Sequence, residues 1–142
     1  MTDITISQDK QKLDFDVIYN FLSTAYWSKG RSRSKVQTTI EKSICFGVYS
    51  GNNQIGFARV VSDESVFAYI MDVFILSEYQ GKGHGTTLMD HILNDPKLKS
   101  VQNWLLATSD AHGLYEKFGF KALPNPQKLM GRTSFSYVEF MS

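Results

Sequence analysis

The segment Gln80-Gly81-Lys82-Gly83-His84-Gly85 lies between an apolar run, 66–76, and a stretch with helical spacing of apolar residues, 88–93. A turn that opens a helix leaves its first backbone N–H groups without intrahelical partners, at the positive end of the helix dipole. Glycine allows the backbone to approach a ligand closely, and Gln80 and Lys82 add side-chain donors. Each charge-assisted hydrogen bond contributes about 1.5–3 kcal/mol. The segment therefore predicts a site for a pyrophosphate group.

Two common phosphate-binding motifs do not fit this segment. A P-loop ends in Gly-Lys-Ser/Thr, whereas the segment continues Gly83-His84-Gly85-Thr86. A dinucleotide-binding fold requires Gly-x-Gly-x-x-Gly, and the spacing Gly81-x-Gly83-x-Gly85 differs. Taken alone, the segment also fits a flexible glycine turn that binds nothing.

The remaining sequence predicts a mixed α/β fold. Asp14 is expected to cap a helix that ends near 26–27, and Ser34 begins a capping box for a second helix that buries Val36 and Ile40. Apolar spacing predicts a helix from 88 that Pro96 ends, and another around Leu114. Strands are expected over 4–6, 45–49, 54–61, 66–76, 104–107 and 135–141, the fourth of them covered on both faces. This order predicts one domain over residues 1–142 around a mixed sheet.

The composition excludes several function classes. A chain of 142 residues with 42% hydrophobic residues can bury a core without disulfides or metals. Its net charge of +1 disfavours nucleic acid and anionic membranes as partners, and no apolar run approaches the length of a membrane span. The single cysteine, Cys45, lies in an apolar run and is expected in the core, while three scattered histidines predict no metal site. A reduced, cytoplasmic setting is expected.

Two segments together resemble the GNAT superfamily of N-acetyltransferases. The family signature Gln/Arg-x-x-Gly-x-Gly/Ala, between the fourth strand and the third helix, is matched by Gln80-x-x-Gly83-x-Gly85. The family's late helix, Ala-x-x-Leu-Tyr-x-Lys-x-Gly-Phe, is matched throughout by Ala111-His112-Gly113-Leu114-Tyr115-Glu116-Lys117-Phe118-Gly119-Phe120. The chain departs from the family at Ser77, where proline is frequent, and at Thr108, where asparagine is frequent.

The resemblance implies a fold and a cofactor. The expected fold is a mixed, mostly antiparallel central sheet flanked by about four helices, with the fourth and fifth strands splayed apart. The implied cofactor is acetyl-coenzyme A, with its pantetheine in the gap between those strands. Family members often form homodimers. The positions implied to bind the cofactor are Val73, Phe74, Ile75, Gln80, Gly81, Lys82, Gly83, His84, Gly85, Thr86, Thr108 and Asp110.

Three side chains are candidates for the chemistry. Tyr115 occupies the position of the family's tyrosine and would donate a proton to the departing thiolate, although its spacing also fits a core aromatic. Asp72 is the only charge in 66–76, on a strand where the family commonly has an acidic general base. The alternative for Asp72 is a structural pair with Arg59. His112 begins the late helix and could relay a proton, whereas His84 is expected to offer its backbone.

The implied activity is acetyl-CoA-dependent N-acetylation of an amine by direct attack in a ternary complex. The acceptor, a small-molecule amine or a protein amine, would lie near Tyr26, Trp27 and Arg31, which equally fit a helix end packed on the core. Arg31 and Arg33 favour an acceptor that bears a carboxylate or phosphate. The alternative function is a non-catalytic acyl-CoA-binding sensor or regulatory module, which would need the glycine-rich loop but neither Tyr115 nor Asp72.

Overall fold

A single five-stranded sheet lies at the centre of the computed structural model, which describes residues 3–133. The strands follow the order β1-β2-β3-β4-β5 across the sheet, antiparallel except for the parallel pair β4 and β5. The expected mixed, mostly antiparallel sheet is thereby confirmed. The strand expected over 135–141 lies outside the described residues. The bounds are β1 Thr5–Ser7, β2 Ile44–Ser50, β3 Asn53–Ser62, β4 Phe67–Ile75 and β5 Asn103–Leu106.

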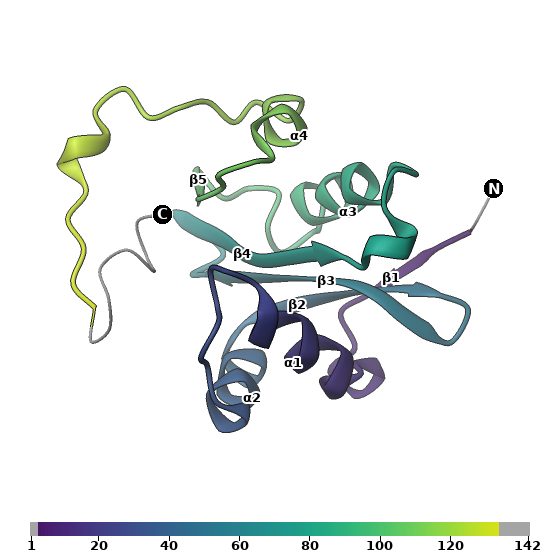
Figure 1. Ribbon diagram of the computed structural model, residues 1–142. Helices are drawn as coiled ribbons and strands as arrows, with labels where there is room; N and C mark the ends of the chain where they lie inside the picture. The colour runs from purple at the N-terminus through teal and green to yellow at the C-terminus, as the bar shows by residue number, and fades with distance from the viewer. Residues whose placement is uncertain (1–2, 134–142) are drawn as a thin grey trace.

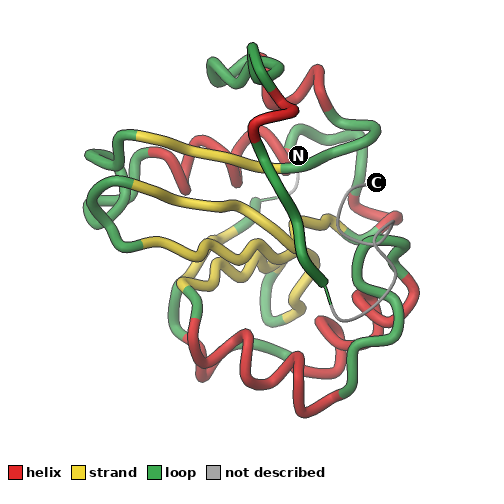
Figure 2. Tube along the Cα trace, turned by 90° about the vertical axis from the view of Figure 1, so that its left-hand side faces the viewer, coloured by secondary structure: helices red, strands yellow, loops and turns green. Residues whose placement is uncertain are grey.

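Helices lie on both sides of the sheet. The helices α1, Phe15–Thr24, and α2, Arg33–Lys42, are on one side, and α3, His84–Leu93, is on the other (Figure 1). The short helix α4, His112–Glu116, follows β5 on the side of α3. Seen at right angles, the strands lie between the two sets of helices (Figure 2). One-turn 3₁₀ helices span Lys10–Lys12, Ser77–Tyr79 and Pro126–Lys128.

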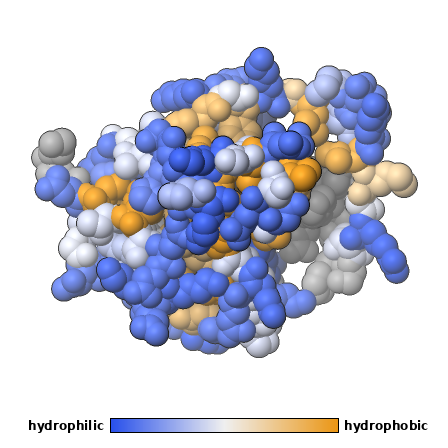
Figure 3. Space-filling view, turned by 180° about the vertical axis from the view of Figure 1, so that it is seen from behind, coloured by the Kyte–Doolittle hydropathy of each residue, from blue (hydrophilic) through white to orange (hydrophobic). Residues whose placement is uncertain are grey.

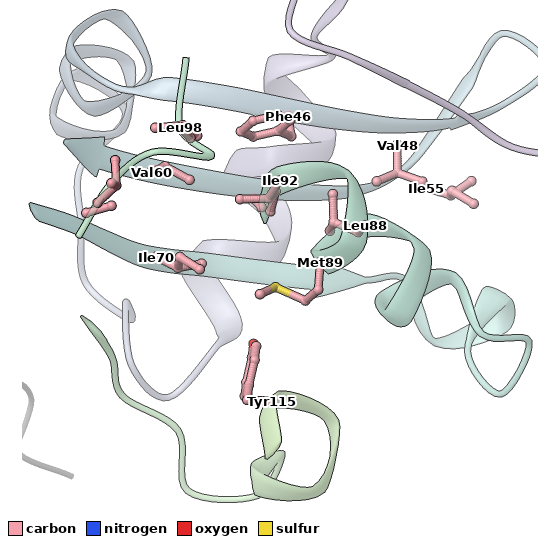
Figure 4. Packing of buried hydrophobic residues seen from close by; sticks show 13 residues of the cluster. Phe46, Val48, Ile55, Val60, Ile70, Leu88, Met89, Ile92, Leu98 and Tyr115 are labelled. Carbon is pink, nitrogen blue, oxygen red and sulfur yellow. The ribbon is translucent and has the colours of Figure 1, made fainter. Parts of the chain in front are cut away.

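Each side of the sheet has its own apolar core. The cluster under α3 and α4 includes Phe46, Ile70, Leu88, Ile92 and Tyr115 (Figure 4). The cluster under α1 and α2 is made of Ile18, Leu22, Val36, Ile40, Cys45, Phe57 and Phe74. Seen from behind, polar residues cover most of the surface, with apolar residues visible between them (Figure 3). No helix within residues 3–133 combines the length and the apolar character needed to cross a lipid bilayer.

Capping side chains set the starts of the first two helices. Asp14 caps α1 as expected, because its carboxylate accepts a hydrogen bond from the Val17 amide at 3.3 Å. The cap of α2 is Ser32 and not Ser34: the Ser32 hydroxyl accepts from the Lys35 amide at 3.1 Å, and Ser34 is already inside the helix. The first helix ends two residues earlier than expected, because Ala25 is extended.

A β-bulge at Asp72 divides β4 into two halves. Arg59 pairs with Met71 and Phe57 with Phe74, so β4 has one residue more than β3 between these pairs. Asp72 itself adopts a φ of +56°, which is uncommon for any residue except glycine. The bulge exchanges the faces of the strand: Ile70 packs in the α3 cluster, whereas Phe74 packs in the cluster under α1 and α2.

The strands β4 and β5 part beyond the bulge. Their pairing runs from Phe67 and Asn103 to Ile70 and Leu106, where β5 ends, while β4 continues to Ile75. This is the splay that the resemblance implied. The expectation that 66–76 is covered on both faces is wrong for the residues that border the gap, Tyr69, Met71, Val73 and Ile75, which are half-buried and line a cleft.

Candidate active site

A cleft of about 740 Å³ opens where β4 and β5 separate. One wall is β4 from Tyr69 to Ile75, and the facing wall is formed by the residues after β5 and by α4. The loop 80–85 borders the cleft beyond Ile75, at the carboxyl end of β4. The connection between α1 and α2 borders it beside Asp72, further back along the strand. The cleft thus joins the predicted cofactor loop to the predicted acceptor residues.

The loop before α3 presents backbone donors that the protein does not use. Among residues 3–133, no acceptor pairs with the amides from Gly81 to Thr86, and the first bond of the helix runs from the Thr87 amide to the Gly83 carbonyl at 3.1 Å. Gly81, Lys82 and Gly83 are exposed. Free amides at a helix N-terminus favour a bound anion.

Positive φ angles explain two of the glycines in this loop. Gly81 has a φ of +79° and Gly83, the N-cap of α3, a φ of +83°. A Cβ at either position would meet no heavy atom within 4 Å. The backbone conformation, and not a lack of space, therefore requires glycine here.

Gln80 and Lys82, the side chains expected to donate to a pyrophosphate, both have contacts within the protein. The Gln80 amide donates to the Ile75 carbonyl at 2.8 Å, so it braces the turn. The Lys82 ammonium lies 5.9 Å from the centroid of the Tyr79 ring, an exposed cation–π contact. Lys82 and Thr86 stand beside the cleft, whereas the other predicted cofactor residues line it: Val73, Phe74, Ile75, Gln80, Gly81, Gly83, His84, Gly85, Thr108 and Asp110.

His84, Thr108 and His112 differ in their surroundings. The His84 ring is buried, and among the described residues its Nε2 has no hydrogen-bond partner. The Thr108 hydroxyl accepts from the Ala111 amide at 3.1 Å and so ties the loop after β5 to the start of α4. His112 is exposed, with its Nε2 3.0 Å from the Thr108 carbonyl oxygen. Its side chain borders a second hollow along β5 and not the cleft.

Tyr115 is both a core residue and a wall of the cleft. It is 8% exposed, and its hydroxyl is directed from α4 toward the side of Met89 (Figure 4). Burial, followed by the negative charge of Asp110, raises the pKa of the Tyr115 phenol. The phenol therefore stays protonated at neutral pH, as a proton donor must.

Asp72 pairs with Arg59, the structural alternative that the sequence left open, and it also accepts hydrogen bonds from Arg31 and Trp27. Its Oδ2 accepts from Arg59 Nε at 2.9 Å and from Arg31 Nη1 at 2.8 Å, and its Oδ1 accepts from Trp27 Nε1 at 3.2 Å. The Asp72 side chain has no exposed surface. Asp72 lines the cleft, and its carboxylate holds Trp27, Arg31 and Arg59 in place around it.

The predicted acceptor residues meet around this carboxylate. Trp27 and Arg31 both contact Asp72, and the Tyr26 ring stands edge-on to Trp27 at 5.2 Å between centroids. A hydrogen bond joins the Tyr26 and Ser109 hydroxyls, so the α1–α2 connection is tied to the loop before α4. All three predicted acceptor residues line the cleft.

Sequence reasoning missed other residues of the cleft wall, among them Phe21, Tyr69 and Met71. Simple alternation along β4 places Tyr69 on the same face as Val73. The bulge at Asp72 puts them on opposite faces, and no sequence signal reveals the bulge. The described residues contain no cluster of three or more histidine, cysteine or acidic side chains able to hold a metal ion.

Comparisons with known proteins agree with this architecture. Residues 41–122 match the family model of the acetyltransferase (GNAT) domain. The [Ribosomal protein bS18]-alanine N-acetyltransferase of Haemophilus influenzae is 31% identical over 82% of this chain and 82% of its own length. Other curated relatives are longer: the chain spans 30% of the length of the chloroplastic GCN5-related N-acetyltransferase 2 of Arabidopsis thaliana.

Solved structures show the same fold. A GNAT-family protein from Xanthomonas campestris pv. campestris has a TM-score of 0.89 and 42% identity, with 94% of each chain covered. A GNAT acetyltransferase from Elizabethkingia anophelis with acetyl-CoA bound has a TM-score of 0.64 at 19% identity, covering 83% of this chain and 76% of its own. From the family model and these relatives together, the chain belongs to the GNAT family of acetyltransferases.

Proposed function

We propose that the protein transfers an acetyl group from acetyl-CoA to an amine by direct attack in a ternary complex. The observation that carries this proposal is the row of backbone amides from Gly81 to Thr86, unpaired among the described residues, at the start of α3 and at the border of the cleft between β4 and β5. Family membership supports acetyl transfer in general.

The described residues fit coenzyme A at this cleft. The free amides of the loop would hold the pyrophosphate. The β4 edge from Met71 to Ile75, which no strand within residues 3–133 pairs on the β5 side, would hold the pantetheine through backbone hydrogen bonds. Acetyl-CoA would supply an activated thioester carbonyl. The acetyl-CoA bound to the Elizabethkingia neighbour supports this choice of cofactor.

Tyr115 is the proposed proton donor, and the single cysteine, Cys45, is unsuited to carry the acetyl group covalently. Tyr115 would protonate the departing thiolate, whose conjugate acid has a pKa of about 8.5. The Cys45 thiol lies in the core under α1 and α2, and burial raises its pKa to about 11. A thiol of that kind is a poor nucleophile, which supports direct attack by the amine.

The acceptor would enter the cleft at the α1–α2 connection, beside Tyr26, Trp27 and Arg31. The Haemophilus relative is named for a protein amine as acceptor, the alanine of a ribosomal protein, so both protein and small-molecule amines belong to the proposal. The proposal also includes a single domain over residues 1–142 and a cytoplasmic location. It further includes the possible assembly of the protein as a homodimer.

Two matched glycine variants test the proposal. Gly83→Glu places a side chain and a negative charge in the loop, whereas Gly51→Glu does the same in the turn after β2. Both glycines have positive φ and open space, so the backbone strain is comparable. In calorimetric titrations, Gly83→Glu is expected to weaken acetyl-CoA binding about a hundredfold or more, and Gly51→Glu to leave it unchanged. Equal affinities of the two variants would contradict the cofactor site.

Thiol release separates the enzyme from a sensor. The wild type is expected to release free coenzyme A from acetyl-CoA only when a suitable amine is present. Binding of acetyl-CoA without thiol release from any amine would favour the regulatory module.

A further inference from the structure

Two arginines share one carboxylate at the acceptor end of the cleft. Arg31 and Arg59 both donate to Oδ2 of Asp72, at 2.8 and 2.9 Å. The side chains of Arg31, Arg59 and Asp72 are 17%, 7% and 0% exposed. The group therefore carries a net charge of about +1 in a region with little contact to water.

The two arginines differ in what surrounds the N–H groups that do not bind Asp72. Arg59 also donates to the Ser43 hydroxyl at 3.0 Å and does not line the cleft. Arg31 lines the cleft, and within residues 3–133 its guanidinium has no acceptor other than Asp72. A guanidinium has five N–H donors in a planar fork, so Arg31 retains donors that Asp72 does not use, on a side chain that lines the cleft.

Arg33 shows that this placement is not a general property of the basic loop. Its guanidinium pairs with Asp16 at 3.0 Å and lies over the rings of Phe15 and Tyr19, at 4.9 and 4.8 Å from their centroids. These partners do not line the cleft. The sequence grouped Arg31 with Arg33, but only Arg31 faces the proposed substrate.

We propose that Arg31 binds a carboxylate on the acceptor, so that the substrate is an amine that also carries a carboxylate, such as an amino acid or a short peptide. This inference rests on the proposed acetyl transfer. A half-buried cation without a full counter-charge is stabilised by an anionic ligand, and a guanidinium binds a carboxylate through two parallel hydrogen bonds. The excess charge of the group made by Arg31, Arg59 and Asp72 equals the charge of one carboxylate, whereas a phosphate carries about −1.5 to −2 at neutral pH.

Asp72 and Arg59 are positioning residues in this scheme. Asp72 orients Arg31 from one side and Trp27 from the other, and Arg59 anchors Asp72 to β3. The aromatic rings of Phe21, Tyr26 and Trp27 border the same end of the cleft and would surround the rest of the acceptor.

Thiol release from acetyl-CoA tests the inference with pairs of matched acceptors. Each L-amino acid or dipeptide is compared with the same compound in which a carboxamide replaces the carboxylate. O-phosphoethanolamine is compared with ethanolamine, which lacks the phosphate. For the wild type, kcat/KM is expected to be about tenfold to a hundredfold higher for the carboxylate member, mainly through a lower KM. Arg31→Gln is expected to remove this preference, and Arg31→Lys to keep part of it. Arg33→Gln, the matched control in the same loop, keeps the preference in full.

Several outcomes would overturn the carboxylate assignment. These are equal rates for acids and amides, an unchanged preference in Arg31→Gln, a preference for the phosphate member, or no thiol release with any carboxylate-bearing amine. Acetyl-CoA titration of the same variants separates the two proposals, because Arg31→Gln and Arg33→Gln are both expected to bind acetyl-CoA as the wild type does. Loss of the acceptor preference with intact cofactor binding would support the assignment, whereas a wild type that fails to bind acetyl-CoA would reject the proposed function itself.

Discussion

At the scale of single residues, Tyr115 combines a packing role with a proposed catalytic one. Tyr115→Phe keeps the ring that packs in the cluster under α3 and α4, so it should change the free energy of unfolding by less than about 1 kcal/mol. The same variant removes the proposed proton donor, and kcat should fall about a hundredfold. Steady-state thiol release and acetyl-CoA titration check both parts.

The Kd for acetyl-CoA should stay at the wild-type value in Tyr115→Phe. Tyr19→Phe serves as the control, because Tyr19 stacks on Phe15 outside the cleft, and it should retain full activity. Wild-type kcat in Tyr115→Phe would remove this tyrosine from the mechanism.

Cys45 gives a pH-dependent prediction at the same scale. Burial raises the pKa of its thiol from 9.0 to about 11 in the folded protein, so the unfolded chain loses this proton first as the pH rises. The stability that depends on the neutral thiol is complete below pH 9 and is lost as the pH approaches 11. This loss amounts to about 2 kcal/mol.

Urea unfolding near pH 8 and near pH 11 checks this expectation. Cys45→Ala lacks the thiol, so its stability should fall by about 2 kcal/mol less than that of the wild type over this range. The buried tyrosines contribute equally to both proteins and cancel in the comparison. Identical pH dependence of the two proteins would show that the Cys45 thiol ionises freely in the folded state.

At the scale of elements, the bulge in β4 places the Asp72 carboxylate where it joins Trp27 and Arg31 of the α1–α2 connection to the sheet. Asp72→Asn keeps a side chain that tolerates positive φ but removes the charge between Arg31 and Arg59. Breaking a buried ion pair in this way costs about 3–5 kcal/mol, because it leaves uncompensated charges behind. Asp16→Asn removes an ion pair with Arg33 on the surface and should cost less than about 1 kcal/mol.

Urea denaturation of the two variants measures the difference. If Asp72→Asn proved as stable as Asp16→Asn, the pair with Arg31 and Arg59 would not contribute to the fold.

At the scale of the whole molecule, the sequence predicted what local chemistry determines. Asp14 caps α1, Val36 is buried under α2, and Gly83 opens α3, because each depends on neighbours within a few residues. The splay of β4 and β5 came from the family resemblance.

Features that depend on distant contacts could not be predicted from the sequence. The positive φ of Asp72 is stabilised by contacts from Trp27, Arg31 and Arg59, which lie far away in the chain. The choice of Ser32 over Ser34 as the cap of α2 is a shift of register that the pattern alone does not resolve. For the same reason the sequence could not tell whether Asp72 serves as a base or as a structural pair.

The proposed acetyl transfer requires main-chain amides that bind a pyrophosphate at the start of α3. Titration of isotope-labelled protein with coenzyme A, followed by amide NMR, observes these groups directly. The largest shifts of the whole backbone are expected at the amides from Gly81 to Thr86. Saturable binding of coenzyme A that leaves these amide signals in place would contradict the proposal.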